Sequence, residues 1–203
     1  MPNPFTGVGI SRLLTMIIVY EPAYFISIFI PVVLVSHFYG GDAFYSILFT
    51  SMNSGRLWLN PLAAIAMVFG LVAILVSTQT KTMLQPFNIP EAEQEIIAGF
   101  ATEFSGPILA LYNFLHDVEI TVTILAITYL YLGGPYPYPH LSIPGILLLI
   151  VKFLAILFIV CLVKAVFGRL RIDQAVKTMF KYSFIPAFIG IVITSVLVFA
   201  MPP

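Results

Sequence analysis

IPGILLLIVKFLAILFIVCLVKAV, residues 143–166, is an apolar run whose charged side chains are Lys152 and Lys164. A helix rises about 1.5 Å per residue, so a run of this length crosses a hydrocarbon layer about 30 Å thick. Four further runs of similar length lie at residues 13–36, 60–80, 106–132 and 183–200. The sequence therefore predicts an all-α polytopic membrane protein: a single transmembrane helical domain over residues 1–203 with five spans.

The composition supports this prediction and excludes other classes. Hydrophobic residues make up 60% of the sequence, charged residues 9%, and the mean hydropathy is +1.05, values far from those of a soluble domain. The formal net charge is zero, which argues against nucleic acid as a partner. The only cysteine, Cys161, excludes a disulfide framework and a cysteine-rich metal site. We expect a multi-pass protein of the cell membrane, surrounded by lipid.

The basic residues near the span ends predict the orientation. One side collects six of them: Arg12, Lys81, Arg169, Arg171, Lys177 and Lys181. The other side has only Arg56. Because cytoplasmic loops carry an excess of Lys and Arg, the first group is predicted to face the cytoplasm and the proline-rich stretch 133–139 the outside. An odd number of spans places the termini on opposite sides, and the first connection, which contains Asn53-Ser54-Gly55, is predicted to be a loop.

QPFNIPEAEQEIIAGFATEF, residues 85–104, is an acidic stretch on the predicted cytoplasmic side. It holds four of the nine carboxylates of the chain: Glu91, Glu93, Glu95 and Glu103. Asn88 is suited to cap a short helix or turn here, with Pro90 in its first turn. One reading is that these acids only solvate a loop and favour a helix N-terminus. The other is that they act together with charges inside the membrane.

Charged side chains also lie within the predicted spans. Glu21 precedes Pro22 in the first span, and His116, Asp117 and Glu119 lie near the middle of the third; Lys152 is deep in the fourth. An ionised side chain at the bilayer centre costs on the order of 3 kcal/mol. We therefore expect these groups to face a polar interior rather than lipid, either paired with one another or lining hydrated cavities.

The spacing of two acids suggests a route for ions. Glu103 and Asp117 are fourteen positions apart, close to four helical turns, so they share a face if Gly106-Pro107 bends the axis only slightly. A row of acids would then lead from the cytoplasmic loop into the membrane and could relay protons. No catalytic, metal-binding or cofactor-binding residue is predicted.

Four landmarks carry a resemblance to a known family. PFNIPEAEQEIIAGFATEFSG resembles the acidic loop of the quinone-proximal membrane subunit of respiratory complex I and of its relatives, the membrane-bound energy-converting hydrogenases, where the pattern runs PFD, EAE, E and EYSG. VYEP at 19–22 resembles the family's SYE, YLGG at 131–134 its FFGG, and GRLRIDQ at 168–174 its PRYRYDQ. The four landmarks occur in the family's order over the whole chain.

The departures from the family pattern are also informative. Asn88 stands where the family has Asp, Phe104 replaces Tyr, and Gly168 replaces Pro, while HDVE at 116–119 stands near the family's AEY. SGPILAL at 105–111 is more similar to the hydrogenase branch than to the quinone branch. Members of the family contain eight spans, and this chain resembles the last five. We therefore expect the first three spans either to lie on another polypeptide or to be absent because this family member is split or truncated.

The resemblance implies a non-catalytic subunit of an oxidoreductase complex, either hydrogenase-like or NADH:quinone-like. Such a subunit anchors the hydrophilic arm and couples its electron transfer to proton or sodium translocation. By the resemblance, six acids match the family's path into the membrane: Glu21, Glu91, Glu93, Glu95, Glu103 and Asp117. Glu119 and Lys152 join this set because of their place in a span, and Arg169, Arg171 and Asp173 match the loop that docks the arm.

The resemblance also implies cofactors and partners. The chain holds no redox cofactor, and its partner subunits carry iron–sulfur clusters and, in a hydrogenase, nickel–iron. The expected partners are hydrophilic iron–sulfur and hydrogenase-like subunits, antiporter-like membrane subunits and a chain that supplies the first three spans. Two other function classes stay open. One is a self-contained secondary transporter, in which Glu21-Pro22 and Gly106-Pro107 would provide the broken helices. The other is a passive membrane scaffold.

Overall fold

The computed structural model describes residues 4–40, 46–90, 99–139 and 142–200, and the regular structure of these residues is entirely helical. The all-α fold predicted from the sequence is confirmed. The elements are α1 (Pro4–Tyr39), α2 (Ile47–Leu57), α3 (Pro61–Lys81), the 3-10 helix η1 (Gly99–Glu103), α5 (Pro107–Leu132), α6 (Ile143–Val166), α7 (Ile172–Met179), the π-helix η2 (Phe180–Phe184) and α8 (Ile185–Ala200).

Five helical segments of the described chain are long and apolar enough to cross a membrane, as predicted. They are α1, α3, α5, α6 and the continuous segment Ile172–Ala200. Three of them match the predicted spans to within one residue. The first begins at Pro4 rather than near residue 13, and the last begins at Ile172 rather than near residue 183, because helix continues past the apolar run at these ends.

The first connection contains a helix that the sequence did not predict. Asn53, Ser54 and Gly55 lie within α2 and not in a loop. Packing explains this helix, because the Ser54 hydroxyl donates to the carbonyl of Tyr129 (3.1 Å). A Cβ on Gly55 would lie 2.5 Å from the ring of Tyr136. The glycine that indicated a turn in the sequence instead lets α2 approach the end of α5.

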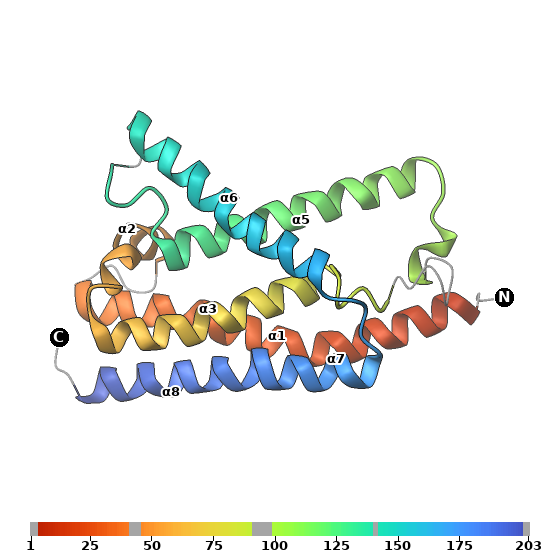
Figure 1. Cartoon of the computed structure of the whole chain (residues 1–203), viewed down its shortest axis with the longest axis horizontal. Helices are drawn as coiled ribbons and strands as arrows, with labels where there is room; N and C mark the ends of the chain where they lie inside the picture. Colours follow the sequence, from red (N-terminus) through yellow and green to blue (C-terminus); the bar gives the residue numbers. More distant parts are fainter. Residues whose placement is uncertain (1–3, 41–45, 91–98, 140–141, 201–203) are drawn as a thin grey trace.

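The bundle consists of α1, α3 and α8 packed side by side, with α5 and α6 lying across it (Figure 1). Within their most apolar stretches, 44% of the residues of α1 and of α3 are buried, against 11% for α5 and for α6. The core includes Tyr131 of α5, whose hydroxyl donates to the carbonyl of Ser27 in α1 (2.5 Å). Most of the surface of α5 and α6 is therefore available to lipid or to other chains.

The ends of the helices fall into the two groups that five spans require. The end of α3, the end of α6 and the whole of α7 lie at the same end of the bundle as the start of α1, while the turn at 133–139 lies at the other end (Figure 1). The start of α1 and the end of α8 also lie at opposite ends of the bundle (Figure 1). The described connections group as predicted, and the assignment of one group to the cytoplasm stays a prediction.

Candidate functional site

One face of α5 carries polar side chains toward the end of α3. Tyr112, His116 and Glu119 are spaced by four and three residues, which places them on one stripe of the helix. The His116 Nε2 lies 2.8 Å from the carbonyl oxygen of Thr82, directly after α3. The Glu119 Oε1 lies 3.7 Å from the Lys81 Nζ. This stripe therefore brings an imidazole and a carboxylate to the last turn of α3.

Lys81 connects three spans of the bundle. Besides Glu119 of α5, its ammonium group lies 4.9 Å from the centre of the Tyr24 ring of α1. The Lys81 and Glu119 side chains are 31% and 40% exposed, so the pair stands at the edge of the packed core. At 3.7 Å the two groups form an ion pair without a direct hydrogen bond of ordinary length. The pair therefore places a carboxylate and an ammonium group between α3 and α5.

Asp117 does not belong to this stripe. It lies two residues from Glu119, and two residues turn a helix by about 200°, so the two carboxylates leave α5 on opposite sides. The Asp117 side chain is exposed, whereas Glu119 is half-buried. In the isolated chain Asp117 faces away from α3, toward whatever surrounds the protein.

Glu103 is not aligned with Asp117 along one helix. It ends η1, and its Oε1 accepts a hydrogen bond from the Thr6 hydroxyl of α1 (3.2 Å). Gly106 then interrupts the helix with φ of 57° and ψ of −129°. The condition for a shared face, a nearly straight axis through Gly106-Pro107, is therefore not met. Aromatic contacts still join the two segments, since the Phe104 and Tyr112 rings lie 5.7 Å apart and the Tyr112 and His116 rings 6.4 Å apart.

Glu119 and Lys81 lie level with the end of α3 rather than at its middle. Glu119 is about 18 Å along α5 by helix geometry, yet it pairs with the last residue of α3. The first turns of α5 consequently extend beyond the end of α3 (Figure 1). Glu119, which the sequence placed near the middle of the third span, thus lies level with the end of the neighbouring helix α3.

Glu21 lies on the surface of α1, directly before Pro22. Its side chain is exposed, but the preceding Tyr20 is buried and lies within electrostatic reach of both Glu21 and Glu119. Glu91, Glu93 and Glu95 lie outside the described residues. The buried Oδ1 of Asn88 accepts no hydrogen bond from the described residues, so the helix cap expected from this residue is not seen among them.

Lys152 lies apart from the acids, at the far end of α5. Its ammonium group donates three hydrogen bonds to main-chain carbonyls, those of Leu132 (2.7 Å), Gly134 (2.9 Å) and Tyr136 (2.9 Å). These carbonyls belong to the last residue of α5 and to the turn after it, where a helix leaves acceptors unpaired and carries partial negative charge. This geometry supports a structural role, in which α6 fastens the end of α5.

Two of the predicted docking residues, Arg169 and Arg171, lie in the connection between α6 and α7, and the third, Asp173, lies in α7. The amide of Leu170 donates to the carbonyl of Pro86 (3.2 Å), which holds this connection against the segment after α3. Arg171 and Asp173 are exposed, and the buried Nη2 of Arg169 has no hydrogen-bond partner within the described part of the chain. Asp173 stands in the first turn of α7, a position that also favours an acid through the helix dipole.

The site includes residues that the sequence did not single out as functional. In the sequence, Lys81 served to predict the orientation of the spans, and nothing in the sequence pattern marked Tyr24 or Thr82 as part of a site. For His116, the sequence feature that suggested a role was its position inside a predicted span. Across residues 4–40, 46–90, 99–139 and 142–200, no group of three or more His, Cys, Asp or Glu residues is placed to hold a metal ion.

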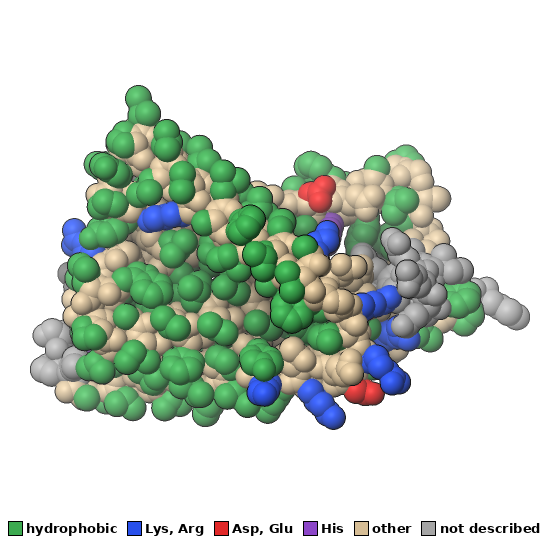
Figure 2. Space-filling view, in the orientation of Figure 1, with side chains coloured by type: hydrophobic (Ala, Val, Ile, Leu, Met, Phe, Trp, Pro, Cys, Tyr) green, Lys and Arg blue, Asp and Glu red, His purple; other side chains and the backbone are tan. Residues whose placement is uncertain are grey.

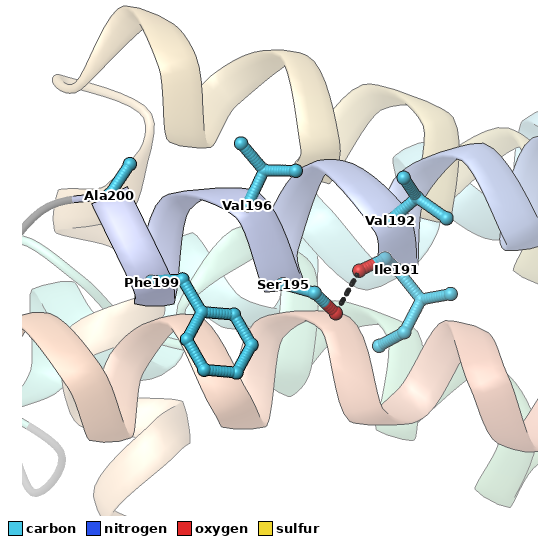
Figure 3. A pocket seen from close by; sticks show the side chains of 6 residues that line it. All are labelled: Ile191, Val192, Ser195, Val196, Phe199 and Ala200. Atoms are coloured by element: carbon cyan, nitrogen blue, oxygen red, sulfur yellow. Dashed lines mark hydrogen bonds between the residues drawn. The ribbon is translucent and has the colours of Figure 1, made fainter.

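A hollow of about 500 Å³ near the end of α8 is unsuited to ion chemistry. It is lined by residues of that one helix, among them Ile191, Ser195 and Phe199 (Figure 3). The Ser195 hydroxyl already donates to the carbonyl of Ile191 (2.8 Å). None of the side chains that line it titrates near neutral pH, so we regard it as a lipid-facing surface.

Comparisons with known proteins relate most of the chain to one family. The family described as NADH dehydrogenase matches residues 1–195. A subunit of NADH-quinone oxidoreductase from Geobacillus sp. (strain WCH70) is 30% identical over 196 residues, covering 96% of this chain and 56% of the relative. The corresponding protein of Geobacillus kaustophilus (strain HTA426) is 33% identical over 141 residues, covering 69% of this chain and 40% of the relative. The chain thus spans about half the length of the curated relatives it matches.

A solved structure has the same arrangement of helices. It is that of the membrane-bound sulfane sulfur reductase, an archaeal respiratory membrane complex. The match has a TM-score of 0.73 and 26% sequence identity, and it covers 95% of this chain and 61% of the other.

Proposed function

Because the chain belongs to the NADH dehydrogenase family, we propose that it is the membrane-anchor and coupling subunit of a multi-subunit respiratory redox complex. In this role it links electron transfer in a hydrophilic arm to the movement of protons or sodium ions through the membrane. The names of its relatives support the proposal, since one is a subunit of NADH-quinone oxidoreductase and the other a respiratory membrane complex. The observation that carries it is the ion pair of Glu119 and Lys81, built from two spans of the bundle.

We place the ion route along the stripe of Tyr112, His116 and Glu119 on α5, which we call the inner stripe because it faces α3. It begins at the acidic loop with Glu91, Glu93 and Glu95 and reaches Glu103, which the Thr6 hydroxyl holds against α1. From there the Phe104, Tyr112 and His116 rings lead along α5 to Glu119. Glu21 joins from α1, next in sequence to Tyr20, which lies within electrostatic reach of both Glu21 and Glu119. The route thus contains carboxylates and an imidazole, with aromatic side chains between them.

We assign Arg169, Arg171 and Asp173 to the docking of the arm. These residues lie beside the segment that follows α3, because the Leu170 amide donates to the carbonyl of Pro86. The redox groups then belong to the partners: iron–sulfur clusters, with a nickel–iron centre in a hydrogenase-type complex or a quinone site in a complex I-type one. The exposed faces of α5 and α6 are available to antiporter-like membrane subunits.

The composition of the purified complex tests this proposal. A tagged chain extracted from its native membrane in mild detergent is expected to bring hydrophilic subunits with it, and with them iron and acid-labile sulfide in stoichiometric amounts. An unrelated multi-pass protein with the same tag is the control. A chain that purifies alone from intact membranes, without iron or sulfide, would contradict the proposal and favour a stand-alone transporter.

A further inference from the structure

An apolar groove of about 560 Å³ lies between α3, α6 and the beginning of the last span. Aliphatic side chains of α3 and α6 form its walls, among them Val72, Leu75 and Val163. Val72 is 42% exposed and Phe167, also in the lining, 55% exposed. The groove therefore opens at the protein surface, and because its walls are membrane-spanning helices, it opens toward lipid.

A hydrogen bond joins the two walls of the groove. The Gln79 side chain of α3 donates through Nε2 to the main-chain carbonyl of Val160 in α6 (2.9 Å). Both residues line the groove. The bond therefore joins α3 and α6 beside the groove.

Two lysines are next in sequence to residues that line the groove, Lys164 to Val163 and Lys181 to Tyr182. Lys164 follows Val160 by one turn of α6, and the Lys181 ammonium group lies 5.2 Å from the ring of Tyr182, a residue of the lining. Both lysines are exposed, and neither forms an ion pair with a carboxylate of the described residues. Asp173 is the sole acid of the sequence after Glu119. Figure 2 shows Lys and Arg side chains gathered toward one end of an otherwise hydrophobic face.

We propose that this groove binds one anionic phospholipid, with an acyl chain between α3 and α6 and the headgroup toward the rim that carries Lys164 and Lys181. An anionic lipid satisfies both features at once, because hydrocarbon fills the apolar channel and the headgroup compensates two cations at membrane-surface depth. A soluble acidic partner would satisfy the lysines but leave the channel empty. An apolar helix of a neighbouring protein would cover the channel but leave the lysines without a counter-charge.

The probe for this site is phosphatidylglycerol. The full chain, with the subunits that purify with it, is placed in phosphatidylcholine nanodiscs, phosphatidylglycerol is added in steps, and the bound lipid is counted by native mass spectrometry. A basic residue near the membrane surface contributes roughly 1 kcal/mol to binding an anionic lipid, so K164Q/K181Q is expected to weaken binding about thirtyfold. The R56Q variant is the matched control, because it loses a cation at the opposite end of the bundle.

A second pair of variants tests the channel itself. V72W fills the groove and is expected to remove bound phosphatidylglycerol, whereas V68W, one turn earlier on α3 and similarly exposed at 47%, leaves it in place. Equal binding by V72W and V68W would overturn the proposal, as would equal retention of phosphatidylcholine and phosphatidylglycerol by the unaltered chain.

A photoreactive side chain at Ile159 is expected to crosslink to lipid, and a crosslink to a protein chain would also overturn the proposal. These experiments measure bound lipid, so their outcome does not depend on whether the protein couples electron transfer to ion movement.

Discussion

Glu119→Gln is expected to lower ion translocation by about two orders of magnitude, the scale on which a positioned proton-transfer group acts, while the complex still assembles. The amide keeps the shape and hydrogen-bonding capacity of the side chain but does not bind and release a proton near neutral pH. Lys81 and Tyr24 stay in place, so the packing of α1, α3 and α5 is retained. The measurement is ion uptake by sealed proteoliposomes during electron transfer.

Asp117→Asn is the matched control for this variant. It makes the same chemical change two residues away, on the exposed opposite face of α5, and we expect uptake close to that of the unaltered complex. The reverse result, with uptake lost in Asp117→Asn and retained in Glu119→Gln, would show that ions follow the outer face of α5. The inner stripe would then be structural.

Lys152→Met is expected to destabilise the protein by about 3 kcal/mol, since it leaves three carbonyls near the membrane without their charged donor. For a chain of this size, such a loss lowers the melting temperature by on the order of 10 °C. Melting followed by intrinsic fluorescence in detergent would measure it. Ion uptake per assembled complex should stay the same, because Lys152 lies at the far end of α5 from Glu119.

Lys177→Met provides the comparison for Lys152→Met. Lys177 is exposed on α7, and its ammonium group makes no hydrogen bond or ion pair with described residues. A melting temperature equal in the two variants would show that the carbonyl contacts of Lys152 contribute little. A specific loss of ion uptake in Lys152→Met would restore the proton-route assignment that the sequence suggested.

The spans were predictable because their length and apolar character are local properties. A helix in lipid must satisfy its backbone internally, so an apolar run of sufficient length has few alternatives. The helix α2 was not predictable in this way. It depends on the contact of Ser54 with the Tyr129 carbonyl and on the close approach of Gly55 to Tyr136, and these partners are distant in sequence.

The candidate site was predictable in its residue types but not in its geometry. The sequence shows acids in a span, but which of them face inward depends on where α5 begins and how far it extends past α3. Gly106, with its positive φ, ends the continuity on which the alignment of Glu103 with Asp117 depended. The pairing of Lys81 with Glu119 follows from the offset between α3 and α5, which no local pattern records.

Lys152 shows the same limit. A lysine deep in an apolar run indicates a polar partner, and the sequence suggested acids. The partners are carbonyls made available where α5 ends and the chain turns, and a sequence pattern does not distinguish a carbonyl acceptor from a carboxylate. The fold was needed to place the turn at Gly134 and Tyr136 around the ammonium group.

The most direct test of coupling is the rate of electron transfer by the purified complex in sealed proteoliposomes, measured before and after ionophores collapse the proton and sodium gradients. If electron transfer drives ions through this protein, the accumulated gradient opposes it, and the rate is expected to rise when the gradient is removed. The rate in Glu119→Gln liposomes should not respond to the ionophores. An unaltered complex whose rate is the same with and without ionophores, in liposomes shown to be sealed, would contradict the account.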